Sequence, residues 1–281
     1  MQIDEKDVDA VCGLVLDLCG VYLDSSKSYL IESRLGEIVK RHGCNSYREV
    51  VDRVRRTSDL RLKSEIIDAI TTNETLFFRD NSPFEAFKHK AFPELLDKKQ
   101  SSPFPKRVRI WSAATSTGQE AYSLAMSICE LLPDADTWDI QILATDISDA
   151  AIAKASRGKY TGHDIKRGVS QEYLNRYFKR IGNDWAVDDR IRSMISFKTF
   201  NLHDSFASLG QFDMIFCRNV AIYFTPEARK SLFQRLIQNL STHGYLFVGS
   251  AEMLTNVGPE FKPQNHCGSV FYQPNVPKLV S

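Results

Sequence analysis

The first part of the chain has the hydrophobic periodicity of helices and almost no strand pattern. Valines and leucines recur at spacings of three and four over residues 8–18, which indicates one apolar stripe along a helix. Similar spacing returns from about Ser28, over residues 50–54 and over residues 62–70. These segments predict a small all-α domain, which we place at residues 1–72.

The pattern changes at residues 108–123, which read VRIWSAATSTGQEAYS. Val108, Ile110 and Trp111 form a short apolar run typical of a strand, and small or hydroxyl-bearing residues then lead to Gly118. Beyond Gly118 the apolar residues return at helical spacing, so this glycine lies where a loop meets a helix N-terminus. We interpret the stretch as the first strand-turn-helix unit of a doubly wound sheet, where such folds bind their ligands.

Strand and helix patterns alternate along the rest of the chain. Further strands are expected at residues 140–145, 195–202, 212–217, 245–248 and 270–272, the last antiparallel, and helices at residues 148–156 and after the N-cap Thr225. Residues 157–194 interrupt the alternation, and we expect a helix and then a short antiparallel hairpin around the turn Asp188-Asp189-Arg190. The predicted fold class is therefore α/β. A Rossmann-like sheet at residues 107–281 carries a β-subdomain insert at about residues 157–194 and follows a linker at residues 73–106.

Composition and net charge are those of a globular chain without a strong global attraction to any partner. Of 281 residues, 43% are hydrophobic and 25% are charged, and the net charge of +1 gives no overall attraction to nucleic acid or an anionic membrane. The six cysteines include no CxxC pair, which argues against a zinc site and against a disulfide scaffold. The sequence has no signal-peptide pattern and no apolar run near the ~18 residues of a membrane span. We therefore expect a cytoplasmic protein without a metal.

Charge is divided unevenly within the predicted helical domain. Residues 1–26 hold six acidic residues and one lysine, a net charge of −5, whereas residues 27–63 hold ten basic and five acidic residues, a net charge of +5. Solvated helix faces would explain this division, and so would a docking surface for an acidic partner. RNA is a weaker candidate, because aromatic residues are scarce among the basic ones.

Two carboxylates indicate which ligand the predicted crevice binds. The turn lacks Gly-x-Gly-x-x-Gly, and Glu120 would repel a phosphate at a helix N-terminus but could accept hydrogen bonds from an ammonium group. Asp146 ends the second strand, where such folds bind the two hydroxyls of a ribose. Either residue alone could be an ordinary helix-start or loop residue. Together, in this order, they favour a nucleoside joined to an amino acid without phosphates, which describes S-adenosylmethionine.

Two more sets of candidate site residues are polar residues that directly follow apolar runs. Residues 71–80 read TTNETLFFRD, and the two phenylalanines would be anchored in a core beside Arg79. This arginine could be a structural ion-pair partner or a fork that binds a carboxylate. Arg218 and Asn219 directly follow the strand at residues 212–217, on the side of the sheet where α/β folds bind ligands.

With NETLFFR, STGQEAYS, ATDIS, FCRNVAIYF and LFVGSAE in this order, nearly the whole chain resembles the chemotaxis receptor methyltransferases, the CheR family. The resemblance implies a helical N-terminal domain and a class I methyltransferase domain with a small antiparallel β-subdomain. It also implies methyl transfer from S-adenosylmethionine to glutamate side chains of methyl-accepting chemotaxis receptors, with S-adenosylhomocysteine as the product. The partner would be the cytoplasmic helices of these receptors, contacted through the basic N-terminal domain and the β-subdomain. We expect a monomer that meets the membrane only through its receptor and binds no nucleic acid.

The resemblance implies a set of cofactor-binding residues. They are Asn73, Thr75, Arg79, Glu120, Asp146, Asn201, Leu202, Arg218 and Asn219. Within this set, Glu120 would hold the amino acid end of the cofactor and Asp146 the ribose, while Asn201 and Leu202 would flank the adenine.

Two residues would be catalytic by the same resemblance, namely Arg79 and Tyr223, although Tyr223 could instead be an aromatic side chain packed at a strand end. The chain departs from the GEEPYS of the family at Gln119 and Ala121, which could alter cofactor affinity or loop rigidity. Methylation of a glutamate needs little acid-base catalysis, because a carboxyl group with a pKa of ~4.3 is already ionised at neutral pH. We therefore expect the protein to orient the carboxylate and strip its water. Two other functions are left open: methylation of another nucleophile, such as a small molecule or RNA, and a non-catalytic cofactor-binding regulatory module.

Overall fold

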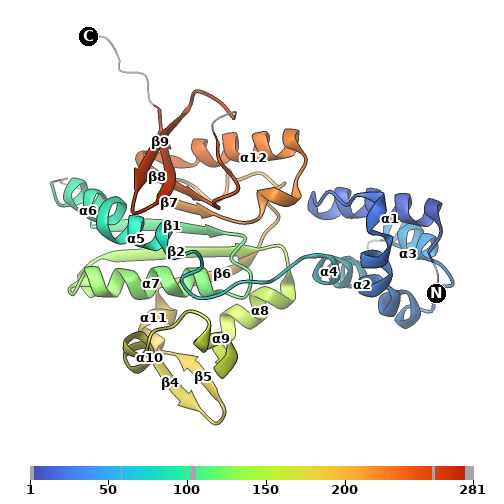
Figure 1. Ribbon diagram of the computed structural model, residues 1–281, viewed down its shortest axis with the longest axis horizontal. Coiled ribbons are helices and arrows are strands. Elements are labelled where there is room, and N and C mark those ends of the chain that lie inside the picture. Colours follow the sequence, from blue (N-terminus) through green and yellow to red (C-terminus); the bar gives the residue numbers. More distant parts are fainter. Residues whose placement is uncertain (1–2, 58, 102–105, 255–256, 276–281) are drawn as a thin grey trace.

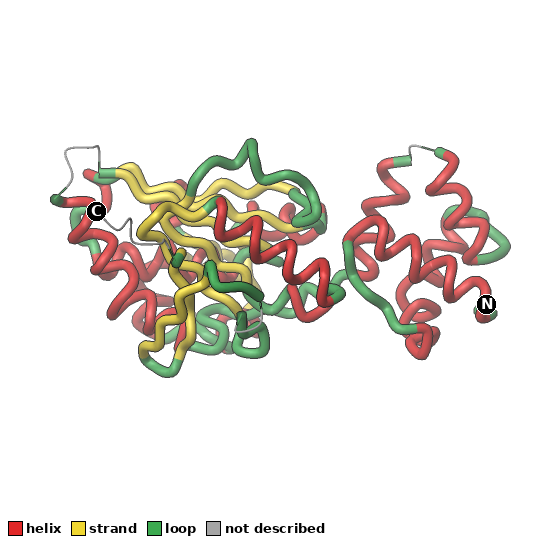
Figure 2. The backbone as a smooth tube through the Cα atoms, turned by 90° about the horizontal axis from the view of Figure 1, so that it is seen from above, coloured by secondary structure: helices red, strands yellow, loops and turns green. Residues whose placement is uncertain are grey.

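The computed structural model describes residues 3–57, 59–101, 106–254 and 257–275, which form two lobes along the long axis of the molecule (Figure 1). The smaller lobe consists of helices, and the larger one is built on a sheet, as the colouring by secondary structure makes plain (Figure 2). Within these described ranges no helix is both long enough and apolar enough to cross a membrane.

The smaller lobe is a helical bundle with its own core. Its elements are α1 (Glu5–Cys19), the short 3-10 turn η1 (Ser25–Lys27), α2 (Ser28–Arg41), α3 (Tyr47–Arg56) and α4 (Leu60–Ile70). Asp4 caps α1 by accepting the N–H of Asp7, and Gly20 ends this helix in the left-handed conformation, at φ 69°. The apolar stripes of the four helices pack into one cluster of valine, leucine and isoleucine side chains. The predicted all-α domain is thus confirmed.

A helical segment connects the bundle to the sheet. It consists of α5 (Ser82–Ala86), the π-helical turn η2 (Phe87–Ala91) and α6 (Phe92–Gln100). Phe84, Phe87 and Phe92 are fully buried and belong to the main core of the larger lobe. Most of the segment that we expected to be a linker is therefore a cover for the sheet. Residues 102–105, also part of that expected linker, lie outside the described residues.

The larger lobe contains a seven-stranded sheet with the order β6-β2-β1-β7-β8-β10-β9. The strands are β1 (Arg107–Ala113), β2 (Asp139–Asp146), β6 (Ile195–Thr199), β7 (Phe212–Cys217), β8 (Leu240–Val248), β9 (Phe261–His266) and β10 (Ser269–Pro274). The first five are parallel, whereas β10 is antiparallel to both β8 and β9. Strand order reverses between β1 and β7, and this switch point is where open α/β sheets bind ligands.

Helices cover both faces of the sheet, as predicted. They are α7 (Gln119–Leu131), α8 (Asp149–Arg157) and α12 (Pro226–Gln238), with the 3-10 turns η3 (Ala135–Thr137) and η4 (Ala221–Tyr223). Successive residues of β1 point to opposite faces, so Ile110 joins the core on the α7 side while Trp111 joins the core beneath α12. Ser148 and Thr225 cap their helices as expected. The antiparallel strand β10 is confirmed, but the edge strand β9 was not predicted.

The β-subdomain projects from the sheet on the α7 side (Figure 1). It comprises β3 (Lys159–Thr161), α9 (Gly162–Lys166), α10 (Gln171–Tyr177), β4 (Phe178–Ile181), β5 (Asp184–Val187) and α11 (Asp189–Ser193). The expected antiparallel insert is confirmed, with three strands in the order β3-β5-β4. The predicted turn at Asp188-Asp189-Arg190 is wrong, because Asp188 accepts the N–H of Arg190 and caps α11. The hairpin turns instead at Gly182, whose φ of 61° suits a glycine.

Candidate functional site

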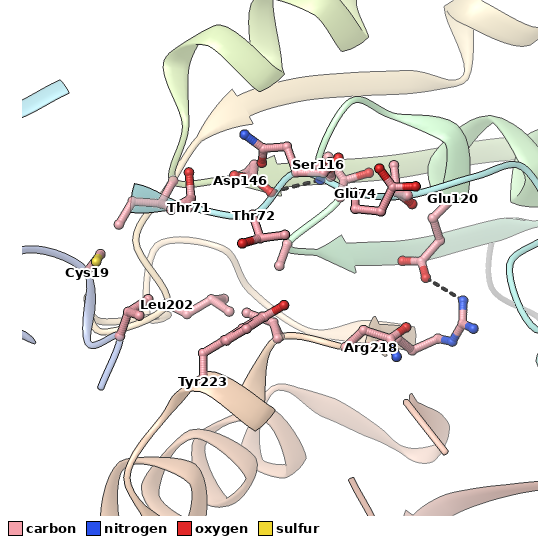
Figure 3. Close-up of a pocket in the computed structure, with 18 of the residues that line it drawn as sticks. Cys19, Thr71, Thr72, Glu74, Ser116, Glu120, Asp146, Leu202, Arg218 and Tyr223 are labelled. Carbon is pink, nitrogen blue, oxygen red and sulfur yellow. Dashed lines mark hydrogen bonds and ion pairs between the residues drawn. The ribbon is translucent and has the colours of Figure 1, made fainter. Parts of the chain in front are cut away.

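All ten residues predicted from the sequence line a single cavity at the switch point of the sheet (Figure 3). The cavity encloses about 1010 Å³, with its open mouth included. The ten residues are Asn73, Thr75, Arg79, Glu120, Asp146, Asn201, Leu202, Arg218, Asn219 and Tyr223. They come from several loops at the carboxyl ends of the strands and from the segment that follows α4, so only the fold brings them together.

The turn between β1 and α7 forms the floor of the cavity. Ala114, Ser116 and Gly118 all have positive φ, of 62°, 53° and 94°. Non-glycine residues in this region cost about 1–3 kcal/mol each and persist only where the surroundings impose them. At Gly118 a Cβ atom would lie 2.8 Å from the Cβ of Ala155, so the helix α8 also requires a glycine here. The turn is therefore fixed by its neighbours and presents small side chains and backbone to a ligand.

Asp146 lies at the end of β2, with 7% of its surface exposed. One carboxylate oxygen accepts the N–H of Ser116 at 2.8 Å, and the other accepts the N–H of Ser148 at 3.0 Å. Burial raises the pKa of Asp146 above its ordinary value of 3.8, although the two backbone N–H groups act in the opposite direction. Each oxygen has a further lone pair to offer, so a buried, pre-oriented carboxylate is available to hydroxyl donors in the cavity.

At the other end of the cavity, Arg218 holds two carboxylates. Its guanidinium donates to Glu120 and to Asp80, in both cases at 2.9 Å, and it also donates to the carbonyl of Arg79 at 2.8 Å. Glu120 accepts a second hydrogen bond from the hydroxyl of Ser112, at 2.8 Å. The sequence suggested that Glu120 awaits a ligand ammonium, but in the structure it already has two partners. Two carboxylates against one guanidinium still leave this end of the cavity negative, which favours a cationic group.

The segment that carries Arg79 has an unusual backbone. Phe78, Asp80 and Asn81 have φ values of 51°, 66° and 44°. Arg218 donates a hydrogen bond to the carbonyl of Arg79, which lies within this segment. Of the two phenylalanines expected to be anchored in a core, Phe77 is fully buried and Phe78 is partly buried against the same core. The side chain of Arg79 donates to the carbonyl of Glu74 at 3.1 Å and borders the cavity. The strained backbone and the hydrogen bond from Arg218 fix this loop and place Arg79 beside the cavity. Within the described hydrogen bonds and ion pairs, Arg79 has no carboxylate partner.

The helical lobe forms one wall of the cavity, which the sequence analysis did not anticipate. Cys19, Val21 and the end of α4 line the cavity together with the predicted residues. The side-chain amide of Asn201 donates to the carbonyl of Leu18 at 2.9 Å, and the N–H of Tyr22 donates to the carbonyl of Tyr223 at 2.8 Å. These contacts join residues that are about 180–200 positions apart, so no local pattern could have revealed them.

Gly20 packs directly against the ring of His203, which lies in the other lobe. A Cβ atom on Gly20 would lie 1.6 Å from Nε2 of His203, so any other residue here would force the imidazole to move, in addition to straining the left-handed backbone. Burial lowers the pKa of His203 below its ordinary value of 6.5, and the charge of Arg235 lowers it further. The imidazole is therefore neutral at neutral pH, as a close-packed contact between the lobes requires.

The loop after β7 carries Arg218, Asn219 and Tyr223 and depends on Glu252, which the sequence analysis included only as the last residue of the motif LFVGSAE. Glu252 is fully buried, and its carboxylate accepts N–H groups from this loop. Apart from that motif, the sequence shows only an acidic residue four positions after the predicted strand at residues 245–248, which is too common to be informative. Tyr223 itself is 38% exposed at the cavity mouth, so it is not a packed aromatic residue at a strand end.

The arrangement separates three chemical environments (Figure 3). Cys19 and Leu202 lie at an apolar end, Glu120 and Arg218 at the opposite end, and Asp146 faces Tyr223 across the space between them. A ligand with an apolar ring, a diol and a cationic amino acid group would meet a suitable surface at each part.

Comparison with known proteins supports this interpretation over nearly the whole chain. The family model described as "CheR methyltransferase, SAM binding domain" matches residues 73–267, and "CheR methyltransferase, all-alpha domain" matches residues 6–71. Chemotaxis protein methyltransferase 1 of Pseudomonas aeruginosa is 42% identical over 260 residues, covering 91% of this chain and 93% of that protein. Chemotaxis protein methyltransferase Cher2 of Pseudomonas putida is 40% identical over 259 residues, with the same two coverages.

A third relative, the chemotaxis protein methyltransferase of Vibrio parahaemolyticus, is 37% identical over 252 residues, covering 87% of this chain and 88% of that protein. The matches therefore extend across both lobes and are not confined to the sheet. With its helical lobe, its sheet and its cavity matched to the same family, the chain belongs to the CheR methyltransferases.

Proposed function

We propose that this protein transfers a methyl group from S-adenosylmethionine to glutamate side chains of methyl-accepting chemotaxis receptors, forming glutamyl methyl esters. The observation that carries the proposal is the convergence of the ten predicted residues on one cavity that both lobes line. The names of the relatives support the same reaction, because each is a chemotaxis protein methyltransferase.

The residues of the cavity fit the cofactor. Asp146 would hold the ribose hydroxyls, because both of its oxygens are already fixed by backbone N–H groups and retain free lone pairs. Glu120 would accept from the ammonium group, with Asp80 adding negative charge nearby. Leu202 would pack against the adenine at the apolar end. For Asn201 we propose two roles. Its amide joins the lobes through the carbonyl of Leu18, and the residue also flanks the adenine in the cavity.

S-adenosylmethionine, when bound, supplies the electrophilic methyl group. The chain would bind the acceptor carboxylate, orient it and exclude water, since this group is already ionised at neutral pH. Arg79 is suited to hold the carboxylate, because it borders the cavity and its guanidinium donates to a carbonyl, with no acidic partner among the residues that the structure describes. The hydroxyl of Tyr223 points into the space between the cavity walls, where it can direct the approach (Figure 3). Orientation of this kind supplies much of the rate in two-substrate reactions.

For the receptor contacts, we propose the basic face of residues 27–63 and the β-subdomain. Many of the basic side chains are paired within the lobe, as in Arg41 with Glu65 at 3.2 Å and Arg55 with Asp17 at 3.5 Å. Their arginines are 59% and 52% exposed, and exposed pairs of this type contribute little to stability. An acidic receptor surface could therefore replace the internal partner at small cost. We further propose that the protein acts as a cytoplasmic monomer, and that its lobes divide near residue 72.

The decisive experiment incubates the protein with radiolabelled S-adenosylmethionine and membranes that contain receptors. Glutamyl methyl esters release volatile methanol in base, whereas N-methyl products keep their label. Label that is stable to base, or that appears on RNA or a small molecule, would favour another nucleophile. Tight cofactor binding with no transfer to any receptor preparation would instead favour a regulatory module.

Tyr223→Phe tests the catalytic part of the proposal. We expect kcat to fall by about 10-fold or more, the range of a lost orienting contact, while the dissociation constant of S-adenosylhomocysteine stays within about 3-fold. Calorimetric titration and initial rates measure the two quantities. Unchanged kcat in this variant would remove Tyr223 from the reaction.

A further inference from the structure

Glu252 follows β8 and is fully buried, yet it has no cationic partner among the described salt bridges. Its carboxylate instead accepts hydrogen bonds from five backbone N–H groups. These belong to Asn219 at 2.7 Å, Val220 at 2.9 Å, Ala221 at 2.6 Å, Ile222 at 3.3 Å and Gly249 at 2.8 Å. Four of the five are consecutive residues of the loop after β7.

Consecutive N–H groups that converge on one anion form a nest, a backbone arrangement that binds negative charge. Hydrogen bonds from N–H groups to a carboxylate are about twice as strong as those between neutral groups. The loop needs such support, because Asn219 has a φ of 58° and η4 is a single three-residue turn without a side-chain cap. The carboxylate of Glu252 therefore determines the path of the loop from Asn219 to Tyr223.

This loop carries side chains of the proposed reaction. Asn219 at its start and Tyr223 at its end both line the cavity, whereas Glu252 does not. Tyr223 is 38% exposed, so side-chain packing alone does not determine its position. Its backbone is held on one side by the N–H bond to Val220 at 3.1 Å and on the other by Tyr22. The orientation of the tyrosine therefore depends on the nest.

Gly249 shows how closely the carboxylate fits. A Cβ atom at this position would lie 2.6 Å from Oε2 of Glu252 and 3.0 Å from the backbone nitrogen of Asn219. Its φ is outside the left-handed region, so the glycine is needed for space and not for backbone freedom.

We propose that Glu252 is a positioning residue for methyl transfer. Its carboxylate orders the loop at residues 219–223 and so fixes Tyr223, without touching either substrate. The inference rests on the proposed function, because it requires Tyr223 to act beside the reacting groups.

Glu252→Gln tests this role with a side chain of nearly the same shape. An amide retains one acceptor oxygen and turns its NH₂ group toward backbone donors, so at least two of the five hydrogen bonds are lost. We expect kcat on receptor membranes to fall about 10- to 100-fold, the effect of displacing a reacting group by about 1 Å. The dissociation constant of S-adenosylhomocysteine should change less than kcat. Amide hydrogens of residues 219–222 should exchange faster, while those of β7 and β8 stay protected.

Tyr272→Phe is the matched control. The hydroxyl of this buried tyrosine accepts the N–H of Leu254 at 2.9 Å, so its loss loosens the segment after Glu252 and leaves the nest intact. We expect this control to retain the kcat of the unchanged protein. An equal fall in kcat for Tyr272→Phe and Glu252→Gln would show general loosening and would overturn the proposal.

Gly249→Ala provides a second perturbation in case Glu252→Gln does not fold. The added methyl group displaces the same carboxylate by contact while retaining its charge. We expect a similar fall in kcat and similar exchange at residues 219–222. Faster exchange with unchanged kcat would refute the positioning role. Absence of methyl transfer by the unsubstituted protein would count against the proposed function itself.

Discussion

Arg218→Met is the substitution whose effect on stability can be derived most directly from the structure. The arginine side chain is 2% exposed and Glu120 is 11% exposed, so this ion pair is buried, whereas Asp80 is 42% exposed. Methionine has a similar length and can occupy the apolar part of the site beside the ring of Phe84, which the guanidinium now covers. The substitution therefore removes the charge with little change in volume.

The cost comes mainly from the carboxylate that is left behind. Removing one partner of a buried ion pair costs about 3–5 kcal/mol, because the remaining charge is uncompensated. The bond to exposed Asp80 should contribute less than about 1 kcal/mol, as is usual for exposed pairs. The hydrogen bond to the Arg79 carbonyl adds about 1.5–3 kcal/mol for a charged donor, although these losses overlap and do not sum. We expect the free energy of unfolding of the larger lobe to fall by about 4 kcal/mol.

Urea unfolding followed by tryptophan fluorescence measures this loss selectively. The chain has three tryptophans, Trp111, Trp138 and Trp185, and all of them lie outside the helical lobe. Adding Glu120→Gln to Arg218→Met should recover at least ~1 kcal/mol, because the uncompensated charge is then gone. A loss below ~1 kcal/mol for the single substitution, or no recovery in the double variant, would refute the reasoning.

Two further predictions concern ligand binding in the cavity. Asp146→Asn should weaken S-adenosylhomocysteine binding by about 10-fold or more in calorimetric titration, the effect of a lost charge-assisted hydrogen bond. Because burial raises the pKa of Asp146 in the folded state, its ionisation opposes folding once the pH exceeds the ordinary value of 3.8. The amide of Asn has only one acceptor oxygen, so one of the two backbone N–H groups that Asp146 accepts also loses its partner in this variant. An unchanged dissociation constant for S-adenosylhomocysteine would remove Asp146 from the cofactor site. Gly20→Ala should weaken the same ligand more than Gly43→Ala, since both glycines have left-handed backbones, at φ 69° and 65°, but only Gly20 abuts His203. Equal affinities in the two variants would mean that the lobe contact does not support the cavity.

The regular elements were predictable because the apolar periodicity is strong where elements are buried. The run from Phe212 to Cys217 is buried at every position and is apolar except for Asp213, and α12 begins at a clear cap. The hairpin turn was misplaced because Gly182-Asn183 and Asp188-Asp189 are both polar, and the sequence does not show which pair caps a helix. The strand β9, with the sequence FKPQNH, was missed because four of its side chains are polar and it contains a proline, as edge strands tolerate.

The candidate site was predictable in part. Glu120, Asp146, Arg218 and Asn219 were derived from their places next to predicted strands, and Arg79 from its place beside two phenylalanines. The rest of the set came from the resemblance to a family. What could not be predicted were the contacts between segments far apart in the chain. Arg218 neutralises Glu120 across 98 positions, and Leu18 meets Asn201 across 183 positions. Such pairings are set by tertiary packing and leave no periodic signal.

Because the helical lobe contributes one wall of the cavity, the sheet lobe alone does not contain the complete site. A truncated chain that begins at residue 73 would retain the whole sheet and all three acidic residues that line the cavity, Glu74, Glu120 and Asp146. It would lose Cys19, Val21 and the end of α4, which form the wall at the apolar end of the cavity. On the proposal that the basic face of residues 27–63 contacts the receptor, the truncation would remove part of the receptor contact together with one wall of the cavity. A lobe swap between relatives would then exchange both features at once.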